Sequence, residues 1–132
     1  MTQPPMRTVP RFNAGDLGRD LWQASLPTWL ERWKSSMVRE ASTSPIDRFV
    51  GSCAVGLEGL VCSATWTFSD HRLVTLCLRP NQGREGLDLL LAELGANPSA
   101  LRRDGDGLFS VRSGDTLLEL DRLDGVITCR EA

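Results

Sequence analysis

Three strand-forming runs in the middle of the chain limit its fold more than any other feature. They are Arg48 to Val55, Leu60 to Ser69 and Leu73 to Arg79. With residues 70–72 as a loop, Trp66 faces Leu76 on an apolar face, and Thr65 faces Cys77 on a polar face. A slip of one residue would mix the two faces. The alternation therefore predicts an antiparallel three-strand meander that buries one face and exposes the other.

The segment before these strands is expected to be helical. Its apolar side chains recur at steps of three and four residues, which is typical of an amphipathic helix. Pro27 interrupts the pattern, and residues 28–31, Thr-Trp-Leu-Glu, have the spacing of a capping box. We therefore predict helices over residues 16–25 and 28–41, or one helix that is kinked at Pro27.

The second half of the chain again combines a helix with strands. Leucines between residues 87 and 94 lie at helical spacing, and Gly95 stands where a helix ends in a left-handed residue. Residues 96–107 are expected to form a loop, with the Asp-Gly-Asp-Gly of residues 104–107 as a flexible turn rather than a calcium site. Three further strand-like runs follow: Leu108 to Arg112, Thr116 to Leu123 and Val126 to Arg130.

The turn between the last two runs carries a strong signal. Residues 124–125 are Asp-Gly, which favours a two-residue hairpin loop. This loop would place Leu120 opposite Cys129 on the buried face and Glu119 opposite Arg130 as an exposed ion pair.

The order of elements predicts an α+β fold. An N-terminal helical segment, an antiparallel β-meander of three strands, an amphipathic helix and a second three-strand meander would pack as a two-layer sandwich. A chain of 132 residues is long enough for one core. Residues 1–13 are polar and rich in proline, which predicts a flexible arm, and residues 14–132 form the single domain.

Composition excludes several classes of protein. The formal net charge of -2 gives no basic face of the kind that nucleic acids require. No run approaches the ~18 apolar residues of a transmembrane helix, so we expect no membrane span. The first residues lack the apolar core of a secretory signal peptide. We therefore expect a cytoplasmic protein, or a periplasmic or secreted one if a signal peptide has been removed.

Two of the four cysteines are expected to be neighbours. A four-residue loop at residues 56–59 would pair Cys53 directly with Cys62 across a hairpin. Opposed antiparallel residues are close enough for a disulfide. In an oxidising compartment these two cysteines could form one, and in the cytosol they would be adjacent buried thiols. The cysteines form no C-x-x-C pair, so we predict neither a metal site nor a cofactor.

No arrangement of residues indicates catalysis. His71 is the only histidine, and its place at a hairpin tip indicates an exposed turn residue. A catalytic histidine has to be held against a nucleophile and oriented by a third group. The aspartates mostly fall in caps and turns. We therefore expect no enzymatic activity.

The tryptophans of the helical segment have two interpretations. Trp22, Trp29 and Trp33 are spaced so that they share one helix face. They could anchor the helix in the core, or form an exposed patch for a partner together with Arg32 and Arg39.

These observations favour a small non-catalytic protein-binding module of the chaperone, adaptor, inhibitor or immunity type. Its partner would be another protein, and it could also pair with a second copy of itself. The order of elements resembles that of the small acidic chaperones of bacterial secretion systems, and residues 114–131, GDTLLELDRLDGVITCRE, are similar to their final hairpin. The resemblance implies a chaperone-like role. The alternative is an extracytoplasmic ligand-binding domain stapled by a Cys53–Cys62 disulfide.

Overall fold

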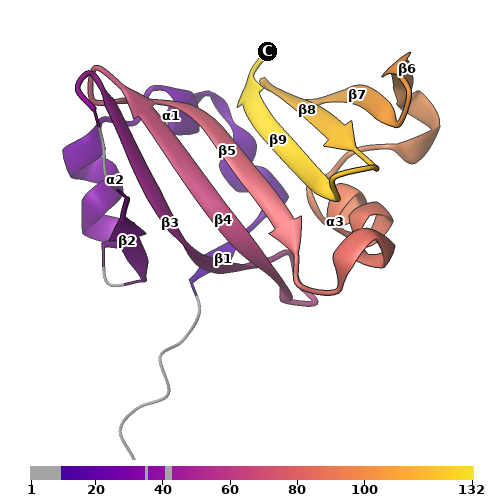
Figure 1. The fold of residues 1–132 in the computed structure, drawn as a ribbon, viewed down its shortest axis with the longest axis horizontal. Coiled ribbons are helices and arrows are strands. Elements are labelled where there is room, and N and C mark those ends of the chain that lie inside the picture. The colour runs from indigo at the N-terminus through magenta and orange to yellow at the C-terminus, as the bar shows by residue number, and fades with distance from the viewer. Residues whose placement is uncertain (1–9, 35, 41–42) are drawn as a thin grey trace, which may run out of the picture.

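A computed structural model describes residues 10–34, 36–40 and 43–132. Its strands form one nine-stranded sheet in the order β1-β3-β4-β5-β9-β8-β7-β6, with β2 also paired to β3 (Figure 1). The strands are β1 (Arg11–Phe12), β2 (Met37–Arg39), β3 (Ile46–Val55), β4 (Leu60–Ser69), β5 (Arg72–Pro80), β6 (Arg102–Gly105), β7 (Leu108–Ser113), β8 (Thr116–Asp121) and β9 (Val126–Glu131). The helical elements are η1 (Ala14–Leu17), α1 (Arg19–Trp22), α2 (Leu26–Trp33), η2 (Gly83–Gly86), α3 (Leu87–Glu93) and η3 (Pro98–Ala100).

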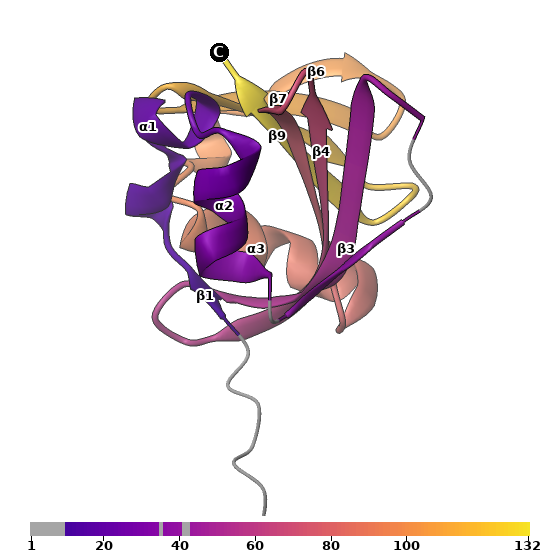
Figure 2. The ribbon, with the colours of Figure 1, turned by 90° about the vertical axis from the view of Figure 1, so that its left-hand side faces the viewer.

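The predicted α+β class is confirmed, but the prediction of two separate three-strand meanders is wrong. Strands β5 and β9 pair antiparallel and join both meanders into one sheet, and β1, β2 and β6 extend it at its edges. The sheet bends around the helices, which lie on its concave side (Figure 2). The apolar side chains of the strands face these helices and form one core. The outer face of the central strands carries no helix (Figure 2).

The predicted register of the β4–β5 hairpin is confirmed from Ala64 to Thr67, but its loop is shorter than expected. Asp70 and His71 both have positive φ, of 51° and 64°, and form a two-residue turn. A bulge between Thr67 and Phe68 leaves Val74 as the extra residue, so that Phe68 faces Leu73. The bulge restores the separation of apolar and polar faces that a two-residue loop alone would destroy.

The helix predicted over residues 28–41 both begins and ends earlier than expected, because α2 spans Leu26–Trp33. Ser25 caps α2 by accepting a hydrogen bond from the Thr28 amide, and Pro27 lies within the first turn, where its missing amide hydrogen costs nothing. Beyond α2, residues 37–39 form β2 and not helix. Gly51 permits this pairing, because a Cβ there would collide with the Ser36 carbonyl oxygen and the Met37 sulfur.

The helix predicted over residues 16–25 is also shorter than expected. It is divided at Gly18 into the 3₁₀ turn η1 and the single turn α1. The flexible arm predicted over residues 1–13 overlaps the fold at its end, since β1 pairs in parallel with β3 and Phe12 is fully buried. The rest of that prediction, residues 1–9, lies outside the described residues.

Helix α3 confirms the prediction from leucine spacing. Its leucines are buried, and Gly95 has a φ of 81°. The amide of Gly95 donates to the Ala92 carbonyl and that of Ala96 donates to the Leu91 carbonyl, which is the Schellman arrangement.

Two predictions for the last quarter need correction. The expected loop over residues 96–107 contains β6, which forms a hairpin with β7 around Asp106 and Gly107. The Asp124-Gly125 turn is part of a four-residue loop, so Cys129 faces Leu118 and not Leu120. The Glu119–Arg130 ion pair exists, at 2.7 Å, but it joins diagonal neighbours. Among the described residues, no helix has the length and apolar character needed to cross a membrane.

Candidate functional site

The three tryptophans of the helical segment lie in the core. Trp22, Trp29 and Trp33 are between 1% and 3% exposed. The indoles of Trp29 and Trp33 pack against Trp66 of β4, with ring centroids 5.4 and 5.1 Å apart. These indoles anchor α2 to the concave face of the sheet, so they offer no surface to a partner in the folded chain.

A buried hydrogen-bond chain connects the first helical turns to β8. The Trp22 indole N–H donates to the Thr116 hydroxyl over 2.8 Å, and that hydroxyl donates to the Leu17 carbonyl over 2.6 Å. Thr116 is completely buried. The chain therefore joins segments that are nearly one hundred residues apart, with every polar atom in it paired.

Arg32 and Arg39, which the sequence placed beside the tryptophans, both have structural contacts. Arg32 donates to the Arg11 carbonyl over 3.2 Å, lies 3.6 Å from the Asp16 carboxylate and stacks on the Trp33 ring. Arg39 forms an ion pair with the nearly buried Asp47 carboxylate, which connects β2 to β3. Each guanidinium holds neighbouring segments together.

The predicted pairing of Cys53 with Cys62 is confirmed. The two residues face each other in the β3–β4 hairpin, both are fully buried, and both are free thiols in this structure. Burial, aided by the Cys62 thiol, raises the pKa of Cys53 to about 12, and burial raises that of Cys62 to about 11. Such thiols stay protonated and react slowly.

We predict that Cys77 reacts first when the native protein is treated with a thiol reagent. Cys77 is the only cysteine that is not fully buried, and its sulfur lies 3.4 Å from the Thr128 hydroxyl on the outer face. The measurement is the number of fast thiols in native protein and of total thiols after denaturation. Cys77→Ser should remove the fast phase. Fast labelling of Cys53 or Cys62 would contradict the burial, and two thiols missing after denaturation would indicate a disulfide.

The outer face of the central strands is not covered by a helix (Figure 2). Its side chains form rows across the strands, and the central row runs from β7 through β8, β9 and β5 to β4. Its members are Ser110, Glu119, Thr128, Cys77 and Thr65. Apart from Glu119, this row consists of short hydroxyl and thiol side chains.

On this face, a groove of about 510 Å³ lies over β5, β9 and β8. Cys77, Leu108, Val126 and Thr128 are among the side chains that line it. Because each strand contributes alternate residues, the floor combines two apolar and two weakly polar side chains. We call it the outer groove.

Charged pairs surround the outer groove. Arg79 lies 3.3 Å from Asp124 on one side, and Arg130 pairs with Glu119 on the other. Asp104, from β6, is a further lining residue. Hydrogen bonds from Ser110 and Arg102, and the charge of Arg102, hold the pKa of the Asp104 carboxyl below its usual value. Each of the three carboxylates, Asp104, Glu119 and Asp124, has an arginine beside it.

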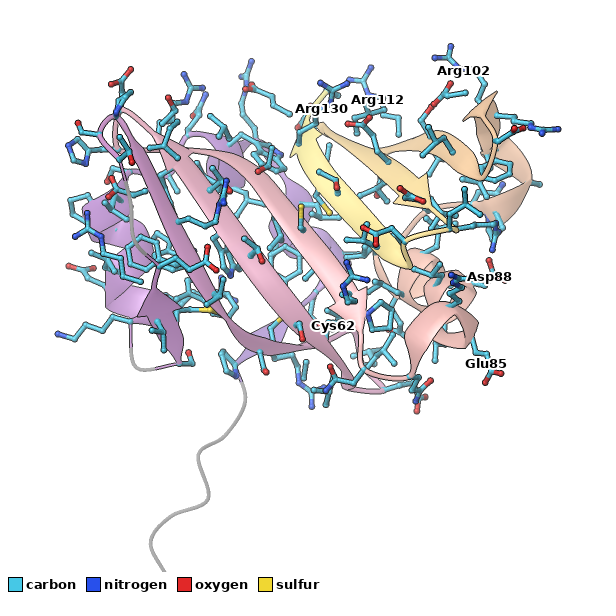
Figure 3. The ribbon with its side chains drawn as sticks, viewed as in Figure 1. Cys62, Glu85, Asp88, Arg102, Arg112 and Arg130 are labelled. Carbon is cyan, nitrogen blue, oxygen red and sulfur yellow. The ribbon has the colours of Figure 1, made fainter. Side chains whose placement is uncertain are left out.

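Three arginines extend along one edge of this half of the sheet. Arg102, Arg112 and Arg130 come from β6, β7 and β9, and their side chains lie along the upper edge in Figure 3. Arg112 and Arg130 both lie opposite Leu117 of β8, one on each side. Within the described part of the chain, Arg112 forms no ion pair.

No family model, curated protein or solved structure matches this chain. In residues 10–34, 36–40 and 43–132, no group of three or more His, Cys, Asp or Glu side chains could hold a metal ion. His71 is an exposed turn residue, as predicted.

The outer groove was missed by sequence reasoning. The alternating pattern assigned Thr65 and Cys77 to a polar outer face, which is correct. It could not indicate that β9 lies beside β5, because that pairing joins residues about fifty positions apart. The sequence did carry one signal for the groove, which is the row of polar side chains on the outer face. Thr128 and Glu119 continue this row once the strand order is known.

Proposed function

We propose that this chain is a small non-catalytic protein-binding module, and that it binds another protein through the outer groove. The observation that carries the proposal is the uncovered outer face, whose groove has a floor of apolar and weakly polar side chains and a rim of charged pairs. Protein interfaces typically combine a desolvated centre with a polar rim, and arginine is enriched in them. The tryptophan patch considered from the sequence plays no part in this proposal, because its indoles are buried.

The charged pairs favour a protein over a small ligand. Three of the four carboxylates that line the groove have an arginine beside them, and the fourth, Asp121, accepts hydrogen bonds from two backbone amides of the β8–β9 loop. The acidic side chains of the groove therefore already have partners within the chain. The charged side chains of a partner protein can form ion pairs with several of these rim residues at once, while the rest of the partner's surface excludes water from the floor of the groove. Leu123, which is 64% exposed in the β8–β9 loop, adds apolar area next to the groove.

The proposal is tested with Thr128→Arg, which fills the outer groove without touching the core. The partner is first isolated on the immobilised wild-type protein from extracts of its source, and its affinity is then measured with purified components. Thr128→Arg should weaken binding by about tenfold or more, since a bulky side chain at an interface centre excludes the partner's own contacts.

Thr67→Arg is the matched control. Thr67 is also half-buried, lies on the same outer face and is absent from the groove lining. The Thr67→Arg substitution should leave the affinity for the partner protein unchanged. Equal binding by both variants would contradict the outer groove as the site, and turnover of a substrate by the purified protein would contradict the non-catalytic role.

A further inference from the structure

Leu57 is the most exposed of the large apolar side chains in the described residues. It lies at the tip of the β3–β4 hairpin and has 88% of its surface exposed. The tip projects beside α3, at the lower edge of the sheet (Figure 1). Single exposed leucines are common on protein surfaces. This one differs because the backbone on both sides of it is fixed by side chains from elsewhere in the chain.

Two side chains hold the tip in place. The Arg11 guanidinium donates to the carbonyls of Gly56 and Leu57 over 3.3 and 3.1 Å. The Glu93 carboxylate of α3 accepts the Leu57 amide hydrogen over 3.1 Å. Gly56 has a φ of 76°, and a Cβ there would collide with the Glu93 carboxylate. The tip therefore presents Leu57 in one backbone conformation, which reduces the entropy lost on binding.

Leu57 lies beside a groove of about 760 Å³ between the hairpin and α3, next to the lining residue Glu58, although Leu57 itself is not part of the lining. Val61 and Leu89, which are 37% and 42% exposed, both line this groove. We call Leu57, Val61 and Leu89 the tip surface. Glu58 and Glu93 also line this groove, and it contains no cationic side chain. The groove is thus apolar with an acidic border, and the Arg11 guanidinium lies beside it at the hairpin tip.

We propose that the tip surface binds an amphipathic helix of another protein, one whose apolar face is bordered by lysine or arginine. The acidic border complements such a helix, and an apolar helix face fits a groove between two elements. An added strand does not fit here, because β3 is paired at the tip with both β1 and β4, and β4 with β5.

The same charges argue against other occupants. In a symmetric pair of copies, the tip surface would face itself and bring Glu58 and Glu93 toward their counterparts. An anionic membrane surface would be repelled by the same two carboxylates. This site is separate from the outer groove, so the inference does not depend on the function proposed above.

The test uses a fluorescent synthetic helix of about 18 residues, long enough to be helical, made of leucine and lysine. A second peptide has the same leucines with glutamate in place of lysine. Binding is measured by fluorescence anisotropy for wild-type protein, for Leu57→Ser and for Val38→Ser, the matched control, since Val38 is 69% exposed on β2. Neither substitution touches the core, so both variants should keep the wild-type unfolding midpoint.

The wild-type protein and Val38→Ser should bind the lysine peptide, and Leu57→Ser should bind it about tenfold more weakly or worse. Thr128→Arg should bind it as the wild type does. The glutamate peptide should not bind. Equal affinity of Leu57→Ser and Val38→Ser, no binding by the wild type, or equal binding of both peptides would overturn the proposal. So would self-association, or attachment to phosphatidylglycerol vesicles, that Leu57→Ser abolishes.

Discussion

Replacement of Trp66 by alanine is expected to lower the free energy of unfolding by about 3–5 kcal/mol. Trp66 is fully buried and contacts the rings of Trp29, Trp33 and Phe12. Its removal would leave a cavity between β4 and α2 that the surrounding rings cannot fill. The measurement is urea denaturation followed by circular dichroism, because the substitution itself changes tryptophan fluorescence.

Trp66→Phe and Thr65→Ala are the controls for this prediction. The Trp66 indole N–H has no partner among the described residues, so phenylalanine loses volume but no hydrogen bond, and it should cost less than alanine. Thr65 is the preceding residue, on the outer face, and its replacement should change stability by about 0.5 kcal/mol or less. A loss below about 1 kcal/mol for Trp66→Ala would contradict the aromatic core.

Thr116→Val is expected to destabilise the fold by about 2–4 kcal/mol although it keeps the shape of the side chain. Thr116 is completely buried, accepts from the Trp22 indole and donates to the Leu17 carbonyl. Valine would leave both of those groups without a partner, and each such group costs about 1–3 kcal/mol. The measurement is again urea denaturation.

Thr116→Ser provides the comparison, since it keeps the hydroxyl and loses only a methyl group. It should cost about 1 kcal/mol, less than Thr116→Val. Trp22→Phe in the Thr116→Val background should cost less than in the wild type, because the indole N–H has already lost its acceptor. A valine variant as stable as the serine variant would show that the hydrogen-bond chain contributes little.

The parts of the fold that sequence reasoning predicted are those with a repeated apolar pattern. The hairpins of β3, β4 and β5 follow from alternation, including the opposed Cys53 and Cys62, and α3 follows from its leucine spacing. The helical segment carried a correct signal for its buried face, because the tryptophans at helical spacing all point into the core.

The incorrect predictions concern segments whose sequence pattern is too short or too polar to distinguish a strand from a helix or a loop. Strand β2 has three residues, and β6 is mostly charged, so neither has an apolar alternation. Both lie at sheet edges, where pairing with a neighbour decides the conformation and short or charged strands limit further pairing. The bulge beside Thr67 pairs Phe68 with Leu73 instead of Val74, and the four-residue β8–β9 loop pairs Cys129 with Leu118 instead of Leu120. Turn residues alone do not predict either change.

Both proposed binding surfaces depend on contacts between distant parts of the chain. The outer groove requires the β5–β9 pairing, and the tip surface requires α3 beside the β3–β4 hairpin. The sequence favoured a small protein-binding module, and one of the two interpretations of its tryptophans was an exposed binding patch. The structure buries those indoles and leaves the opposite face of the sheet uncovered.

The most direct test of binding through the outer groove is site-specific photo-crosslinking in source cells. A photoreactive amino acid is placed at Thr128 in the groove, at Thr67 on the same face outside it, or at Glu31 on the exposed side of α2. We expect position 128 to crosslink one defined protein, and positions 67 and 31 to give little or none of that product. Crosslinks to a protein partner from position 31 and none from position 128 would contradict the central claim.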